Sequence, residues 1–279
     1  MYSLKDTMKS VENLIDEENN YDSYLIIGMP LRDNTPPAQN VKSQEYIDID
    51  VIGYSTGYVD IIGETVDVAR NYIMETALSS NAKYLLFMGE DTVLPFDGFQ
   101  QLHKTAEANP GCVVSGVYYT KFSVPMIRIQ EGRWIKPADV APGKIIEAHN
   151  TGMDAMLIPV NVLRKLKEMK PNEPFCLVYN EYDEETDSRY MIGEDYYFSY
   201  RLREAGIKLL VDTNVQCLHV DLATGKYTAH PSVDLNNYHT KIKITEPLTM
   251  ADKIRVDNSW EERLPPLPNL LYRTNMIGD

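Results

Sequence analysis

The sequence predicts an α/β fold, a sandwich in which helices cover both faces of a mostly parallel sheet. Short apolar runs alternate with segments whose apolar residues recur with a helical period, as in repeated strand–helix units. Two acidic pairs stand at the ends of such elements: Glu90-Asp91 follows an apolar run, and Glu194-Asp195 opens a helical segment. Such sheets bind ligands at the carboxyl ends of their strands, so both pairs stand where a site is expected.

Strands are expected where short apolar or alternating runs end at Gly, Pro, Asn or Asp. The expected strands are residues 24–28, 46–54, 84–88, 112–119, 155–159 and 207–211. Loops are expected at residues 32–44 and 57–63 and at the polar, acidic segment 171–192, whose acidic part, residues 181–187, is a candidate lid over the site.

Helices are expected where apolar residues recur every three to four positions, as they do from Val66 to Ala77. Pro95 is a start signal for a helix, and Gly206 is a stop signal for another. The expected helices are residues 4–15, from 64 onward, 95–108, 160–169 and 194–205.

The 279 residues suffice for one large domain with extensions. We expect a helical segment at residues 1–22, a main domain at 23–225 and a C-terminal extension at 226–279. The extension has few apolar runs and a proline cluster, and we expect it to wrap the core or to mediate homo-oligomer assembly.

Composition excludes several classes of function. The net charge of −14 disfavours a protein that binds nucleic-acid backbones non-specifically, because such binding needs a basic surface. The three cysteines lack CxxC spacing and predict buried free thiols rather than a zinc site. No run of about 18 apolar residues predicts a membrane span, and no signal-peptide pattern is present. We therefore expect a cytoplasmic protein, in the host cytoplasm if a virus encodes it.

Four segments, spread over roughly residues 24–221, carry a resemblance to a known family. Val68–Asn71 places Ala-Arg-Asn at a helix start, and Leu86–Pro95 closes a strand with an acidic pair and a proline. Asn150–Ile158 sets a glycine before an apolar run, and Gly193–His219 runs from the second acidic pair to a late histidine. Together they resemble nucleotide-sugar-dependent glycosyltransferases of the GT-A fold, especially the family-2-like enzymes of bacteria and viruses.

The resemblance implies a GT-A-type α/β/α sandwich that moves a hexosyl or pentosyl group from a nucleotide-diphosphate sugar to an acceptor hydroxyl, with inversion. It implies a divalent metal, Mn²⁺ or Mg²⁺, that stabilises the departing nucleoside diphosphate. Asp91, His219 and Glu90 are the candidate ligands, since carboxylates suit both ions and imidazole suits Mn²⁺ better. Without the resemblance, Asp91 equally fits a solvated acid or a helix N-cap, and His219 a packed histidine.

The resemblance also assigns the catalytic pair. Asp195 is the expected base that accepts the proton of the acceptor hydroxyl, and Glu194 binds the acceptor or orients Asp195. Their place at a helix N-terminus predicts that Asp195 is held in its ionised form. The alternative is a pair of acids that only stabilises the helix start.

Further residues are placed by position in the family pattern. The expected nucleotide-sugar contacts are Pro30, Arg32, Asp33, Asp60, Arg70 and Lys121. Arg70 fits either a donor phosphate or a structural ion pair. The expected acceptor contacts are Trp134, which can stack on a sugar ring or pack in the core, and Gly152, which lets the backbone approach a ligand.

One departure from the family pattern matters. Counting back from Pro95, the first acid of the family's Asp-x-Asp falls on Gly89, so the segment reads Gly-Glu-Asp. Glu90 is a candidate substitute. The departure also favours a second reading, a degenerate GT-A domain that binds a nucleotide sugar or glycan without turnover.

Two other enzyme classes fit less well. A sugar-phosphate nucleotidyltransferase needs a Gly-rich phosphate loop after the first strand, which Met29–Asp33 does not provide, and no GxGxxG supports a dinucleotide oxidoreductase. The acceptor stays open among glycan, polysaccharide, protein and modified nucleobase, and so do the sugar and the nucleotide base.

Overall fold

The structure is a computed structural model, and it describes residues 24–31, 56–120, 123–130, 133–183, 188–221, 224–238, 244 and 246–247. Of residues 179–183 and 188–191 it describes the backbone alone. The expected N-terminal helix, the expected strand 46–54 and most of the C-terminal extension lie outside the described residues. The domain boundaries at residues 22 and 225 stay predictions.

A seven-stranded sheet forms the centre of the described fold. β1 pairs in parallel with β2 and β3, and β13 pairs in parallel with β5. β10 lies antiparallel between β3 and β5, and β8 is an antiparallel edge strand. In spatial order the strands are β2 (Thr56–Ile62), β1 (Leu25–Leu31), β3 (Tyr84–Met88), β10 (Ala155–Pro159), β5 (Val113–Val117), β13 (Leu209–Gln216) and β8 (Ile145–Ala148).

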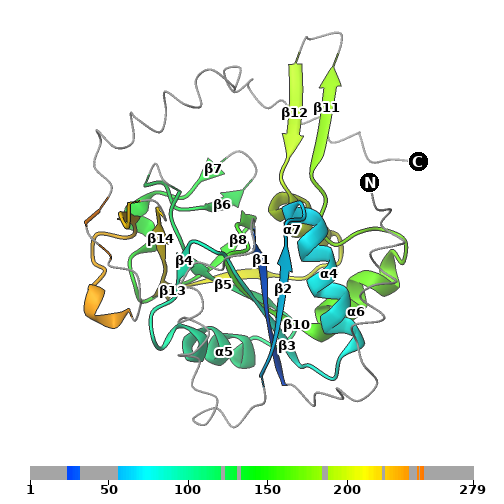
Figure 1. The fold of residues 1–279 in the computed structure, drawn as a ribbon, viewed down its shortest axis with the longest axis horizontal. Helices are drawn as coiled ribbons and strands as arrows, with labels where there is room; N and C mark the ends of the chain where they lie inside the picture. The colour runs from blue at the N-terminus through cyan, green and yellow to red at the C-terminus, as the bar shows by residue number, and fades with distance from the viewer. Residues whose placement is uncertain are drawn as a thin grey trace.

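Helices cover both faces of this sheet (Figure 1). α4 (Val66–Ser79), α6 (Val160–Met169) and α7 (Glu194–Glu204) share one core cluster, and α5 (Gly98–Ala108) packs in the other. Successive residues of β3 alternate between the clusters, because successive side chains of a strand point to opposite faces. The predicted fold class, an α/β/α sandwich with a mostly parallel sheet, is confirmed. No helix among the described residues is both long and apolar enough to cross a membrane.

Smaller sheets and turns flank the central sheet. A three-stranded sheet joins β4, β14 and β15, and another joins β6, β7 and β9. The segment after β15 packs on the same body, since Phe96 N donates to Asn237 O over 2.9 Å and the Tyr238 hydroxyl donates to Gln216 O. These elements are β4 (Thr92–Val93), β14 (Leu218–Val220), β15 (Tyr227–Thr228), β6 (Ile127–Gln130), β7 (Arg133–Trp134), β9 (Asn150–Thr151), η1 (Pro137–Val140) and η2 (Leu235–Asn237).

Two expected loops are wrong. Residues 57–63 were expected as a loop, but Thr56–Ile62 forms strand β2, which pairs with β1 along its length as an exposed edge strand. The expected loop at 171–192 contains an antiparallel hairpin of β11 (Tyr179–Asp183) and β12 (Ser188–Ile192). β2 contains Gly57 and Asp60 and alternates between half-buried and exposed residues, and the hairpin sequences contain several charged and polar residues, so a search for buried apolar runs does not detect either segment.

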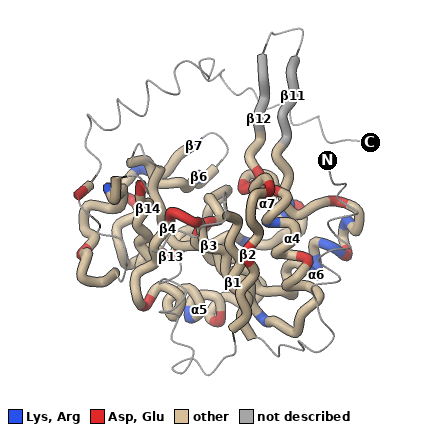
Figure 2. Tube along the Cα trace, in the orientation of Figure 1, with Lys and Arg blue, Asp and Glu red and all other residues tan. Residues whose placement is uncertain are grey.

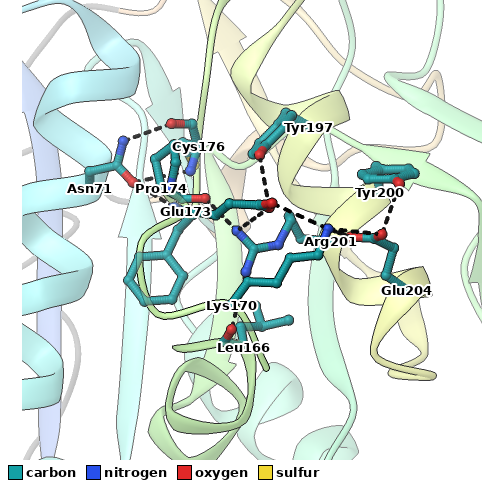
Figure 3. Close-up of polar contacts among 11 residues, drawn as sticks. Asn71, Leu166, Lys170, Glu173, Pro174, Cys176, Tyr197, Tyr200, Arg201 and Glu204 are labelled. Atoms are coloured by element: carbon teal, nitrogen blue, oxygen red, sulfur yellow. Dashed lines mark hydrogen bonds and ion pairs between the residues drawn. The ribbon is translucent and has the colours of Figure 1, made fainter. Parts of the chain in front are cut away.

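A buried arginine fixes α7 against α6 and the segment between α6 and the hairpin (Figure 3). Arg201 has a side chain only 2% exposed and donates to Pro174 O over 2.6 Å and to Leu166 O over 3.1 Å. Glu173, at 3.5 Å, compensates its charge and also accepts from the Tyr197 hydroxyl. Leu166 O, in the last turn of α6, also accepts from Lys170 N over 3.2 Å, so Arg201 is its second donor and ties the end of α6 to α7.

The same segment is tied to α4 by Asn71 (Figure 3). Its side-chain amide donates to Cys176 O over 2.7 Å, and its carbonyl oxygen accepts from Phe175 N over 2.8 Å. α4 and α7 are thus anchored to the same short segment, which holds their relative position.

We expect Arg201→Leu to lower the free energy of unfolding by about 2–4 kcal/mol, since it removes the Arg201 donors to Pro174 O and Leu166 O and the ion pair with Glu173. Chemical denaturation measures the change. Arg164→Leu, at an exposed position of α6, is the matched control and should change stability by less than about 0.5 kcal/mol. Equal effects of the two substitutions would show that the Arg201 contacts contribute nothing.

Candidate active site

Pairing of β4 with β14 brings Asp91 and His219 together. Residues 89–91 form the turn after β3, and β14 runs antiparallel to β4 with His219 opposite Thr92. Val220 N donates to Asp91 O over 2.8 Å, and His219 Nε2 lies 3.1 Å from Asp91 Oδ2. Figure 2 shows acidic residues at this turn and at the start of α7.

The imidazole of His219 is fixed by a bond on its far side. Its Nδ1–H donates to Tyr119 O over 2.7 Å, which leaves Nε2 facing Asp91. Burial alone would lower the pKa of His219, but its hydrogen bond to Asp91, the charge of that carboxylate and the Tyr119 carbonyl raise the pKa above its usual value. Asp91 therefore favours a positive charge on its partner, and a cation could replace the proton between them.

Arg70 joins two further acids. From α4 its guanidinium reaches Asp154 Oδ1 at 2.7 Å and Glu194 Oε1 at 2.5 Å, with a side chain 5% exposed. Burial opposes the charged form, but Asp154 and Glu194 outweigh it and raise the pKa of Arg70. Its charge is thus engaged by two carboxylates, the geometry of the structural ion pair that was one of its two expected roles.

Asp154 was missed by the sequence reasoning. It stands just before β10, and its backbone oxygen accepts from Gly89 N over 3.0 Å. It interacts electrostatically with Arg70, Asp91, His219 and Glu194, and burial raises its pKa while Arg70 opposes the rise. The start of an antiparallel strand meets the carboxyl ends of its parallel neighbours, so Asp154 shares their edge, but no local pattern of the sequence signals the direction of this strand.

Asp195 lies in the first turn of α7 beside Glu194. Its Oδ1 accepts from Tyr196 N over 2.7 Å. Burial and the charge of Glu194 raise its pKa to about 6, against the opposing effects of Arg70 and the Tyr196 N–H. The expectation that the helix start holds this acid ionised is therefore outweighed by burial and a like charge. A carboxyl with a pKa near neutrality is suited to accept a proton.

Aromatic and cationic side chains lie around Tyr196, the residue after Asp195. The guanidinium carbon of Arg128 lies 4.4 Å from the ring centre of Trp134 and 5.6 Å from that of Tyr196. Trp134 is 40% exposed, so it is a surface residue rather than a core residue. A Cβ on Gly152 would lie 1.6 Å from the Tyr118 hydroxyl oxygen, so this glycine admits the Tyr118 ring.

The other nominated residues are more scattered. Pro30 is half-buried one residue before the end of β1, and Asp60 is exposed on β2 rather than in a loop. Glu90 is half-buried in the turn beside Asp91. Arg32, Asp33 and Lys121 lie outside the described residues.

The Asp91–His219 pair fits a divalent cation. Adjacent ligands of an octahedral ion with bonds of about 2.1 Å stand about 3.0 Å apart, and the two ligand atoms are 3.1 Å apart. Across the part of the chain that the structure describes, no three His, Cys, Asp or Glu residues are grouped to hold a metal ion. Mg²⁺ commonly binds one or two protein carboxylates and completes its shell with water and phosphate, so two protein ligands suffice.

No protein-family model and no curated protein sequence matches the chain. Among solved structures, A197 from STIV is similar at 19% identity with a TM-score of 0.49, over 71% of this chain and 86% of that one. GalNAc-T7, solved with UDP, GalNAc and Mn²⁺, is similar at 10% identity with a TM-score of 0.43, over 72% of this chain and 44% of that one. These scores are too low to carry an argument, and the fold class is taken from the sheet itself.

We expect Asp195→Asn to raise the melting temperature by a few degrees at pH 8. Because the pKa of Asp195 is raised to about 6 in the folded protein, its ionisation above that pH destabilises the fold, and asparagine removes the buried charge. The difference should shrink as the pH falls through the folded and unfolded pKa values and vanish near about pH 3, where the carboxyl is neutral in both states. Melting curves from about pH 3 to 8 measure it, and a variant that melts lower at pH 8 would contradict the destabilising effect of this charge.

Proposed function

We propose that the protein is a GT-A-type glycosyltransferase that moves a sugar from a nucleotide-diphosphate sugar to an acceptor hydroxyl, metal-assisted and with inversion. The observation that carries the proposal is the meeting of Asp91–His219 and Glu194–Asp195 at one edge of the sheet, linked through Arg70 and Asp154. The α/β/α sandwich supports it, since ligands of such sheets bind at this edge.

In this proposal Asp195 is the base. Its carboxylate accepts the proton of the acceptor hydroxyl as that oxygen bonds to the anomeric carbon, while the bond from this carbon to the diphosphate oxygen breaks and the diphosphate keeps the electron pair. Glu194, held by Arg70 at 2.5 Å, fixes the start of α7 and raises the basicity of its neighbour.

Asp91 and His219 would hold the divalent ion, with Glu90 beside them in the turn. The ion supplies positive charge against the diphosphate leaving group. Pro30 and Asp60, on neighbouring strands, are assigned to the nucleotide together with Arg32, Asp33 and Lys121.

Trp134 and Gly152 are assigned to the acceptor side. The 40% exposure of Trp134 and its contact with Arg128, which also stacks on Tyr196 next to Asp195, support this assignment. An exposed ring close to the base is a suitable platform for the face of a sugar.

We expect one class of nucleotide sugar to raise the melting temperature of the protein in the presence of Mn²⁺, and EDTA to abolish the shift. A ligand that binds only the folded state must stabilise it. The measurement is a thermal-shift panel of UDP-, GDP-, CMP- and dTDP-sugars, each with Mn²⁺, Mg²⁺ or EDTA. A chain that binds none of these donors under any condition would contradict the proposal.

Two substitutions should separate binding from transfer. Asp195→Asn should lower donor hydrolysis or transfer at least 10³-fold with donor binding largely intact, since it removes the proton acceptor. Asp91→Ala should abolish the Mn²⁺-dependent thermal shift. Glu107→Gln, in an exposed ion pair with Lys83, is the control and should change neither. Normal transfer by Asp195→Asn would refute the assignment of the base.

Gly89 favours a second candidate function, a domain that binds a nucleotide sugar or glycan without turnover. The family's acid is missing at this position. A Mn²⁺-dependent donor shift with neither transfer nor hydrolysis of the donor, unchanged in Asp195→Asn, would favour it.

A further inference from the structure

The space that a side chain on residue 89 would occupy is filled by the side chain of Asp154. A Cβ built on Gly89 would lie 2.7 Å from both Cβ and Cγ of Asp154 and 3.0 Å from Thr92 Oγ1. β10 runs antiparallel to β3 with Ala155 opposite Met88, so Asp154 is the cross-strand neighbour of Gly89. Their backbones are joined by the 3.0 Å bond from Gly89 N to Asp154 O. The side chain that position 89 lacks is thus replaced by a carboxylate from the adjacent strand.

We propose that Asp154 supplies the donor-site carboxylate whose family position is residue 89, and that it accepts a hydrogen bond from a hydroxyl of the nucleotide sugar. This inference rests on the proposed function. Under this proposal, residue 89 must be glycine so that Asp154 has room. Under the second candidate function, the glycine marks a carboxylate that the site has lost.

The surroundings of Asp154 support a hydroxyl as the ligand. Its side chain is 24% exposed, so a ligand can reach it, and it interacts electrostatically with Asp91 and Glu194. Arg70, 2.7 Å from Oδ1, compensates its charge in part while also pairing with Glu194, and a carboxylate is a strong hydrogen-bond acceptor. A hydroxyl group is bound well by such a carboxylate.

The experiment moves the carboxylate from one strand to the other. Four variants are compared with the unmodified protein: Gly89→Asp, Asp154→Gly, the double variant Gly89→Asp/Asp154→Gly, and Gly89→Ala/Asp154→Gly. The last is the matched control, because it fills the space at residue 89 without a carboxylate. The probes are the UDP-, GDP-, CMP- and dTDP-sugars with Mn²⁺, and the readouts are the melting temperature without ligand and the donor Kd by calorimetry.

Without ligand, Gly89→Asp should melt several degrees lower than the unmodified protein, since it places two side chains in one space. Gly89→Asp/Asp154→Gly should recover most of that loss, because a carboxylate on residue 89 enters the volume that Asp154 vacates. If the losses of melting temperature caused by the two single substitutions simply add in the double variant, the two side chains do not share one space, whether or not a donor binds.

With donor, Asp154→Gly and Gly89→Ala/Asp154→Gly should raise Kd about 10- to 100-fold, the loss of a charged hydrogen bond. Gly89→Asp/Asp154→Gly should bind within a few-fold of the unmodified protein. If both double variants bind the donor equally weakly, the proposed role of Asp154 is wrong. Donor binding by the unmodified protein would still support the proposed function in that case. No donor binding by the unmodified protein would overturn both.

Discussion

The buried guanidinium of Arg70 is the interaction on which the rest of the site depends. Only 4% of this residue is exposed, and two carboxylates from different elements, Asp154 before β10 and Glu194 at the start of α7, compensate its charge. An uncompensated buried charge is strongly unfavourable, so each of the three groups requires the other two. The Arg70 guanidinium thereby ties α4 to the start of α7 and to the turn before β10.

The second constraint is the set of contacts that hold α7 in position. Arg201 secures the helix to the end of α6, and Asn71 secures the intervening segment to α4, the helix that carries Arg70. The acids at the start of α7 are therefore held from both ends of their helix. On the other side of the site, the pairing of β4 with β14 holds Asp91 against His219 without using either acid of α7. The charge of Asp154 links the two halves, and the buried Tyr118 ring, which packs edge-on against His219, interacts with acids of both.

Much of the sandwich could be predicted from the sequence, because buried parallel strands such as β3 are continuous apolar runs and α4 has a clear helical period. The edge strand β2 was missed because its half-exposed sequence contains the turn-like residues Gly57 and Asp60, and the β11–β12 hairpin was missed because its sequence contains several charged and polar residues. The nearness of Asp91 and His219 came from the family resemblance alone. Asp154 and the raised pKa of Asp195 depend on which strands are neighbours and on how deeply the acids are buried, which local patterns do not encode.

The antiparallel strand β10 has a consequence for how such a chain is recognised. A strand that runs against its neighbours delivers its first residues, rather than its last, to the edge where the acids gather. Positions 89 and 154, far apart along the chain, then share one volume and are expected to change together during divergence. A search pattern written for consecutive residues finds no carboxylate at position 89. A pattern written for cross-strand pairs finds the carboxylate of Asp154 in the same space.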